Sequence, residues 1–266
     1  MKPIFFTKME ATGNDFVLID NREGMFKEFL RSNGAKEIIK KMLDRHFGIG
    51  GDGLIILEEA KGYPFSMKYF NCDGSEAVLC LNGARCAVDF AYRLGIINAK
   101  GKFLTPAGPI GFFHQSHAVS IEVNPPTEIN LNLVIAIGQK KHKVHFLKLG
   151  VPHTVIFVDD YDEIDILKLG SAIRNHKTFA PEGTNVNFVR NDEKELFVRT
   201  YERGVEGETL SCGSGAVCSA YIAIKLFIVS SPVLVKTNGG ELNVTVDDRL
   251  YLEGPVNFVC DGTYYL

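Results

Sequence analysis

One pattern occurs twice in this chain, 132 residues apart. Residues 80–86 (CLNGARC) resemble residues 212–218 (CGSGAVC), and residues 105–110 align with residues 237–242 at the same offset. A constant offset over two segments indicates two copies of one unit, and such a repeat decides the architecture. Two long copies predict a duplicated domain rather than a solenoid of short repeats.

The composition is that of a globular protein. The chain has 266 residues, of which 45% are apolar and 23% are charged, and its net charge is −3. This length suits one large domain or two of about 130 residues. The near-neutral charge offers no basic face, so we expect no nucleic-acid partner. No apolar run is long enough to cross a membrane, and the N-terminus does not resemble a signal peptide. We therefore expect a cytoplasmic protein with reduced thiols and no membrane partner.

The spacing of apolar residues predicts a mixture of helices and strands. Helical spacing covers residues 38–46, where Gly48 should end the helix, and residues 164–174. A helix should also begin just after the cysteine of each repeat copy. Gly95 can cap the first of these helices, and the second, over 216–228, is apolar nearly all round and should be buried on all sides. The predicted strands cover residues 65–70, 118–123, 130–137, 144–149, 155–158, 195–201, 233–236, 241–246 and 250–252.

Cys80 and Cys212 differ from the other cysteines, of which we interpret Cys72, Cys218 and Cys260 as small buried side chains. No cysteine pair is spaced C-x-x-C, and we expect no metal site. Cys80 and Cys212 each lie in a turn at a predicted helix start, where unpaired N–H groups and the helix dipole favour a thiolate. If the two halves face each other, one thiolate can remove the α-proton of an amino acid while the opposite thiol returns one. This arrangement predicts inversion at an α-carbon without a pyridoxal-type cofactor.

The chain resembles the diaminopimelate epimerase family in five ordered blocks. The resemblance implies an α/β (α+β) fold with two pseudo-symmetric halves, each a curved mixed sheet or barrel around a central helix. The expected halves are residues 1–114 with 255–266, and residues 115–254, and the active site should lie in a cleft between them. The family also implies a small amino-acid substrate, no cofactor, and a homodimer as one arrangement. The blocks are TGNDFVLID at 12–20, FGIGGDGL at 47–54, NCDGSE at 71–76, CLNGARC at 80–86, and YERG, GET and CGSG at 201–204, 207–209 and 212–215.

The resemblance also implies a role for each matching residue. Cys80 would be the acid and Cys212 the base in the LL-to-meso direction, and the two roles exchange in reverse. His153 and Glu202 would tune the pKa values of the thiols. The backbone at Leu81, Asn82, Gly213 and Ser214 would hold the reacting carboxylate, and the side chains of Asn14, Asn71, Asn185, Glu202 and Arg203 would bind the rest of the substrate.

Three positions depart from the family pattern, and two of them, Leu81 and Val151, leave the substrate open. Leu81 replaces the usual Gly and would be costly if the backbone needs a positive φ there. Val151 stands where many members have a substrate-binding Asn, and one extra residue between Arg203 and Cys212 is interpreted as a bulge. Two alternatives are a racemase of proline, hydroxyproline, histidine or glutamate, and a non-catalytic amino-acid-binding relative. Without the blocks, Asn14 and Asn185 would be interpreted as turn residues and His153 as structural.

Overall fold

A computed structural model describes residues 3–26, 30, 34–116, 118–193 and 195–265, and the chain forms two compact units. The N-terminal unit comprises residues 1–122 and 253–266, and the C-terminal unit comprises residues 123–252. None of the helices within these described ranges is long and apolar enough to span a membrane.

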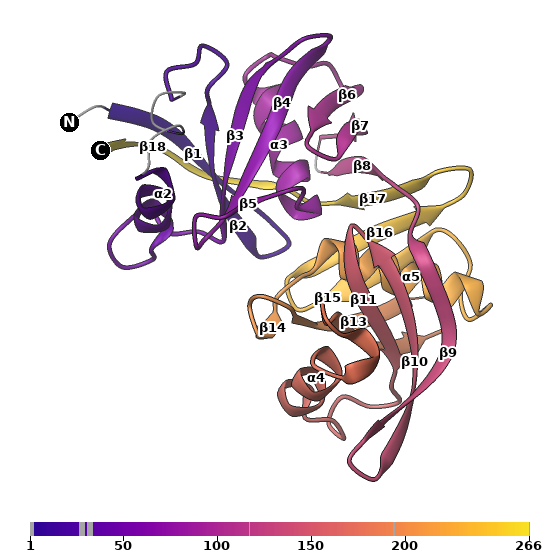
Figure 1. Ribbon diagram of the computed structural model, residues 1–266. Helices are drawn as coiled ribbons and strands as arrows, with labels where there is room; N and C mark the ends of the chain where they lie inside the picture. Colours follow the sequence, from indigo (N-terminus) through magenta and orange to yellow (C-terminus); the bar gives the residue numbers. More distant parts are fainter. Residues whose placement is uncertain (1–2, 27–29, 31–33, 117, 194, 266) are drawn as a thin grey trace. The chain divides into compact units, whose positions relative to one another are not determined.

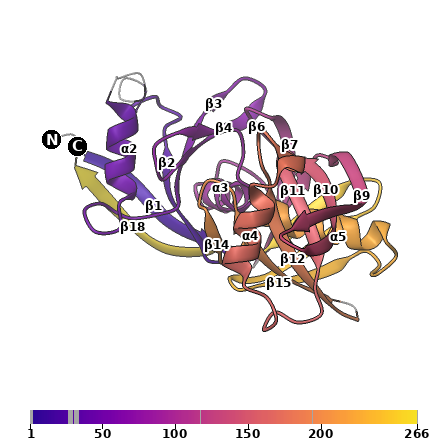
Figure 2. The same ribbon diagram turned by 60° about the horizontal axis from the view of Figure 1, so that its bottom comes forward.

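In the N-terminal unit, strands surround one buried helix, α3 (Figure 1). Residues 81–91 of α3 are all buried, because strands β1, β2, β3, β4 and β7 pack around the helix. The C-terminal strand β18 pairs antiparallel with β1 and lies beside it in both views (Figures 1 and 2). The elements of this unit are β1 (Pro3–Ala11), β2 (Asn14–Asp20), α2 (Ala35–Leu43), β3 (Gly53–Ala60), β4 (Tyr63–Asn71), β5 (Glu76–Ala77), α3 (Leu81–Arg93), β6 (Lys100–Thr105), β7 (Gly108–His114), β8 (Val119–Val123, its last residue in the other unit) and β18 (Asn257–Tyr265).

The C-terminal unit repeats this plan around helix α5. Strands β10, β11, β12, β13, β15 and β16 pack around α5, whose residues are mostly buried. The elements of this unit are β9 (Thr127–Ile137), β10 (Lys140–Leu149), β11 (Val151–Phe157), α4 (Ile166–Arg174), the 3-10 helix η1 (Lys177–Phe179), β12 (Asn185–Asp192), β13 (Glu195–Glu202), β14 (Gly207–Thr209), α5 (Gly213–Lys225), β15 (Val233–Thr237), β16 (Gly240–Val246) and β17 (Leu250–Gly254, its end in the other unit).

The two units share one topology. In each, a parallel strand pair is joined through a helix: β2 with β3 through α2, and β11 with β12 through α4. An antiparallel neighbour follows in both units, and then the central helix and a hairpin. The hairpins even share a hydrogen bond, because Thr105 donates to the Gly108 carbonyl (2.8 Å) and Thr237 to the Gly240 carbonyl (2.9 Å). The prediction of two similar halves, each a sheet around a central helix, is therefore confirmed.

Two of the predicted helix ends were wrong. Helix α2 stops at Leu43, because Asp44 adopts an extended conformation and its carboxylate accepts the N–H groups of the next residues, so His46 is exposed outside the helix. Gly48 instead lies against the end of α2, where a Cβ atom would overlap with the Lys41 carbonyl. Helix α5 stops at Lys225 rather than at residue 228.

Candidate active site

The two repeated cysteines are the N-cap residues of α3 and α5, as the sequence predicts. Cys80 and Cys212 have nearly the same backbone conformation, with φ −121° and ψ 120° for the first and φ −112° and ψ 106° for the second. The Cys80 Sγ accepts a hydrogen bond from the Gly83 N–H (3.5 Å), and the Cys212 Sγ accepts one from the Gly215 N–H (3.4 Å). Each sulfur therefore lies at the positive end of a helix with an N–H donor, which favours a thiolate.

Cys80 lies beside two of the predicted substrate-binding residues. Its thiol is 3.8 Å from the Asn14 Oδ1, which also accepts a hydrogen bond from the Asn82 side chain (3.3 Å). The Asn14 Nδ2 donates to the Asp52 carboxylate (2.6 Å), so the amide of Asn14 presents its oxygen to the cysteine turn. The structure thus brings Asn14, Asn82 and Cys80 together on the N-terminal unit.

An ion-pair network beside Asn14 was missed by the sequence analysis. Arg45 bridges the carboxylates of Asp15 (2.6 Å) and Asp52 (2.8 Å), and Lys8 also pairs with Asp15 (2.6 Å). Burial raises the pKa of the Asp15 carboxyl, but hydrogen bonds and charges from Arg45 and Lys8 outweigh burial and hold that pKa well below its usual range. Asp52 is part of the GGDG block, and that block was the available signal for this network.

Asn71 is oriented within its own loop. Its side chain donates to the Ser75 hydroxyl (3.1 Å), and its backbone N–H donates to the Ser75 carbonyl (2.8 Å). Asn71 lies at the end of β4, before the loop that leads to α3 and Cys80.

Cys212 is buried and lies close to a hydroxyl group. Its Sγ is 3.4 Å from the Ser214 Oγ, and either atom can donate. Below this turn lies Asn187, a fully buried residue that the sequence analysis gave no role. Its amide donates to the Thr154 carbonyl (3.1 Å) and accepts from the Thr200 hydroxyl (3.0 Å), which fixes its orientation under α5. The alternation of Asn185 and Asn187 along β12 was the signal that could have identified it.

His153 is completely buried and faces two amides. Its Nε2 lies 3.4 Å from the Asn185 Nδ2, and its Nδ1 lies 3.3 Å from the Asn187 Nδ2. Burial, assisted by the positive charge of Arg203, lowers the pKa of His153 to about 3. The ring is therefore neutral at physiological pH, and it contributes to the site as a hydrogen-bond partner of these amides rather than as a cation.

Asn185 also holds the segment that carries Arg203. Its Oδ1 accepts a hydrogen bond from the Arg203 N–H (2.8 Å). The Arg203 guanidinium donates to the Glu182 carbonyl (3.1 Å) and is half-buried, which leaves other N–H groups able to bind a carboxylate. Glu202 is the last residue of β13 and is half-buried beside them. The structure thus brings together His153, Asn185 and Arg203 on the C-terminal unit.

The three departures from the family pattern have plain structural outcomes. Leu81 is the first residue of α3 and is not among the described residues with a positive φ, so the expected backbone cost does not arise. The extra residue was wrongly interpreted as a bulge: the β13–β14 ladder pairs Glu202 with Gly207 without interruption, and residues 203–206 form the turn. Val151 is at the start of β11 and is exposed.

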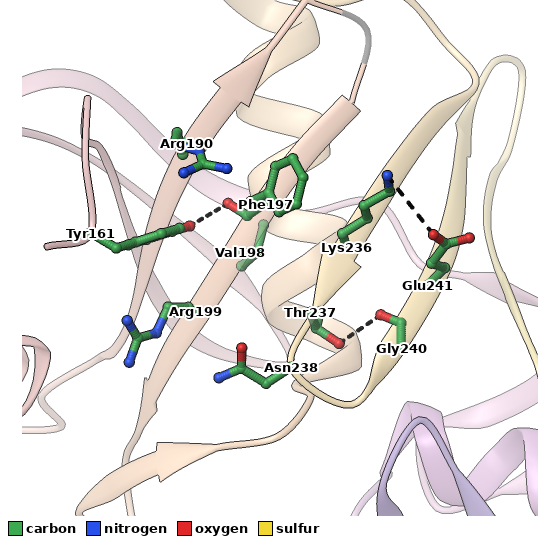
Figure 3. Close-up of a pocket in the computed structure, with 10 residues that line it drawn as sticks. All are labelled: Tyr161, Arg190, Phe197, Val198, Arg199, Lys236, Thr237, Asn238, Gly240 and Glu241. Atoms are coloured by element: carbon green, nitrogen blue, oxygen red, sulfur yellow. Dashed lines mark hydrogen bonds and ion pairs between the residues drawn. The ribbon is translucent and has the colours of Figure 1, made fainter.

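A surface pocket of about 410 Å³ in the C-terminal unit contains none of the predicted site residues (Figure 3). Its cations alternate with aromatic rings, since Arg190 lies 4.6 Å from the ring centre of Phe197. Arg199 is paired with Glu208 (2.6 Å) and Lys236 with Glu195 (2.8 Å). Two of its three cations therefore already have carboxylate partners. The pocket is best explained as a row of ion pairs and cation–π contacts that stabilises the sheet surface.

Solved structures define the class of this fold. A phenazine biosynthesis protein of the PhzF family from Bacillus anthracis matches with a TM-score of 0.76 and 16% identity over 100% of both chains. A probable proline racemase from Agrobacterium radiobacter K84 matches with a TM-score of 0.75 and 12% identity over 99% of this chain and 93% of that chain. The protein therefore has the duplicated α+β fold that these proteins share.

Sequence comparison identifies the family within this class. The profile described as diaminopimelate epimerase matches residues 6–127 and 145–259. Diaminopimelate epimerases from Hydrogenobaculum sp. and Aquifex aeolicus are each 40% identical to this chain. Both alignments cover 97% of this chain, and they cover 98% and 96% of the two relatives, respectively. One from Methanocella arvoryzae is 41% identical over 98% of this chain and 97% of its own. The chain belongs to the diaminopimelate epimerase family, and it is an isomerase.

Proposed function

We propose that this protein is a cofactor-independent epimerase that interconverts LL- and meso-diaminopimelate with two thiols. The observation that carries this proposal is the pair of N-capping cysteines. Cys80 and Cys212 occupy the same position in the two copies of one unit, each with a backbone N–H directed at its sulfur. Two equivalent acid–base groups are what a symmetric inversion requires. Membership of the family supports the choice of substrate.

In the LL-to-meso direction, the Cys212 thiolate removes the α-proton and becomes a thiol. The electron pair that remains on the α-carbon delocalises into the carboxylate. The carboxylate oxygens accept hydrogen bonds from the backbone N–H groups at the two helix starts. The Cys80 thiol then gives its proton to the opposite face of the α-carbon and becomes a thiolate. One proton is lost and one gained, so the only net change is the configuration. The reverse direction exchanges the two roles, and the two thiols should titrate as a coupled pair.

The remaining polar groups fix the substrate. Backbone N–H groups at Leu81, Asn82, Gly213 and Ser214 hold the reacting carboxylate, where the partial charge of each helix start stabilises the carbanion. Arg203 binds the distal carboxylate, which a monocarboxylic amino acid lacks. Asn14, Asn71, Asn185 and Glu202 bind the amino groups and the remaining oxygens. His153 acts as a neutral hydrogen-bond partner that orients Asn185.

This reaction supplies meso-diaminopimelate for lysine and peptidoglycan precursors in the cytoplasm. The substrate is a small amino acid, and neither nucleic acid nor a membrane takes part. A homodimer is compatible with the proposal but is not needed for the chemistry.

The test is proton exchange in D₂O without added cofactor. The protein is incubated with LL-diaminopimelate, with the meso form, and with proline, hydroxyproline, histidine and glutamate. Deuterium uptake at the α-carbon and loss of optical purity are then measured. Inversion of diaminopimelate alone supports the proposal. Inversion of another amino acid identifies a different racemase, and tight binding without exchange identifies a non-catalytic relative.

Variants of the cysteines test the mechanism. Cys80→Ala and Cys212→Ala should each abolish inversion and leave the circular dichroism spectrum unchanged. Cys260→Ser is the matched control, because Cys260 is an exposed free thiol on β18. The prediction that Cys260 and Cys72 are buried was wrong, since both are exposed, and it was right for Cys218. Near-normal turnover of either alanine variant would contradict the two-thiol mechanism.

A further inference from the structure

The two cysteine turns differ by one buried charge. Arg85 is the fifth residue after Cys80, and Val217 is the fifth residue after Cys212. Both side chains are completely buried in α3 and α5, respectively. The duplicated units therefore share a backbone at this position but not a charge, because the counterpart of Arg85 in α5 is the apolar Val217.

All the hydrogen-bond partners of Arg85 among the described residues are neutral. Its Nη1 donates to the Asn82 Oδ1 (3.0 Å) and its Nη2 to the Thr12 Oγ1 (3.2 Å), while its Nε has no acceptor within the described part of the chain. No described carboxylate forms an ion pair with it. A buried charge without a counter-ion destabilises a folded protein, because no partner offsets the loss of its hydration. Such a group is commonly retained for a function.

The guanidinium stays charged in spite of its burial. Burial lowers the pKa of Arg85 to about 10, which is still well above neutral pH, and negative charge on Cys86, Cys80 or Glu10 opposes that lowering. Of these, Cys86 is buried, and burial raises its pKa well above the usual value for a thiol, so it remains neutral. Of the two thiols, Cys80 is the one that is partly exposed.

We infer that Arg85 is a positioning residue whose buried positive charge favours the thiolate of Cys80, and that Val217, at the equivalent position of α5, gives Cys212 no such support. This inference rests on the proposed function and deepens it, since it assigns unequal electrostatics to the two acid–base groups. Arg85 also fixes the Asn82 carboxamide: because the Asn82 Oδ1 accepts from Arg85, its Nδ2 is directed at Asn14, next to the Cys80 sulfur.

The other charged groups around α3 do not supply an unpaired positive charge that would stabilise the Cys80 thiolate. On β1, Glu10 is negative and accepts the Gly13 N–H (2.8 Å). At the far end of α3, Asp89 is paired with Arg93 (2.6 Å) and with His114 of β7 (2.7 Å). In the ion-pair network of Lys8, Asp15, Arg45 and Asp52, each carboxylate already has a cationic partner.

The experiment measures the pKa of each thiol by alkylation without substrate. The full-length protein is treated with iodoacetamide from pH 5.5 to 10, and the modification of Cys80 and Cys212 is followed separately by peptide mass spectrometry. In Arg85→Gln, the pKa of Cys80 should rise by about one unit, which means roughly tenfold slower alkylation below that pKa. The pKa of Cys212 should not rise in the same molecule, since loss of the Cys80 thiolate cannot disfavour the thiolate of its coupled partner, and Arg85→Lys should restore most of the Cys80 reactivity.

Arg93→Gln is the matched control, because it removes a cation from the same helix at its half-exposed far end. A folded Arg85→Gln variant with an unchanged Cys80 profile would overturn the inference, as would equal shifts at both cysteines. If Arg85→Gln does not fold, Arg85→Lys decides: the Cys80 profile should stay close to wild type, and a shift of a full unit in spite of the retained charge overturns the inference. Since no substrate is present, the result does not depend on whether diaminopimelate is epimerised.

Discussion

Gly95 and Phe227 occupy the same place in the two units, one residue beyond the C-caps of α3 and α5, and both have a left-handed backbone, with φ of 70° and 59°. The following residue donates its N–H back into the helix at the same distance, 2.9 Å, in both units. This is the hydrogen-bond pattern of a Schellman motif, which favours glycine at this position. The repeat therefore extends to the helix ends, and only the second copy has a residue with a Cβ there.

Phe227→Gly should stabilise the protein. A left-handed conformation costs an L-residue about 1 kcal/mol or more, and the Phe227 side chain is 95% exposed, so its loss sacrifices little burial. We expect a gain of about 1 kcal/mol in the free energy of unfolding, measured by urea titration. Phe227→Ala, which removes the ring but keeps the Cβ, is the control and should change stability little. An equal gain in both variants would show that the ring, and not the backbone, is responsible.

Alanine substitutions at Gly83 and Gly215 should differ in sign or size, although the two residues are equivalent. A Cβ at Gly215 would overlap with the Asn187 Oδ1, whose amide is fixed by backbone and hydroxyl partners. A Cβ at Gly83 would meet the flexible end of Ile55 at 3.0 Å. We expect Gly215→Ala to destabilise by about 2 kcal/mol. Gly83→Ala should be close to neutral, because helix propensity offsets a small shift of Ile55. Thermal unfolding of both variants measures the difference, and equal losses would contradict this explanation.

The buried neutral His153 should make stability depend on pH. Its folded pKa of about 3 lies below the value of about 6.5 in an unfolded chain. Its contribution is therefore fully present above pH 6.5 and is lost as the pH falls from there towards 3, with a slope of about 1.4 kcal/mol per pH unit. In His153→Gln, this part of the pH dependence of the free energy of unfolding should disappear, as measured by urea titrations at pH 5 to 8. His46→Gln at an exposed site is the control, and a slope that persists in His153→Gln would mean that another group causes it.

The sequence predicted several strands that have one buried face and missed three that are buried on both. Strand β4 alternates between buried and partly exposed residues, and its pattern indicated a strand. Strands β2, β3 and β12 contain runs of four or five consecutive buried residues and show no alternation, because they are parallel strands covered on both faces. Strand β18 was missed for the opposite reason: its residues are mostly exposed, and its partner β1 lies at the other end of the chain.

The candidate site shows a similar division. The cysteine turns could be predicted because the N-cap position depends on local sequence and occurs twice. The contacts of His153 with Asn185 and Asn187 could not, since they require the parallel pairing of β11 with β12. The neutral state of His153 follows from burial, which no local pattern reveals. Arg85 was visible in the CLNGARC block, but its lack of a counter-ion is a property of the folded core.

The ion-pair network beside Asn14 should stabilise the N-terminal unit at neutral pH and lose this stabilising contribution at low pH. Because Arg45 and Lys8 hold the pKa of Asp15 below its usual range in spite of burial, the contribution of this carboxylate is present above about pH 4 and is lost as the pH falls through the folded value. Asp15→Asn should therefore cost about 2 kcal/mol at pH 7, the size of a charged hydrogen bond, and less as the pH falls below 4. Urea titrations at pH 7, 4 and 3 measure the difference between variant and wild type. Glu59→Gln, at an exposed position on β3, should follow the wild type throughout. A difference for Asp15→Asn that stays constant from pH 7 to pH 3 would mean that the side chain acts through packing and not through its charge.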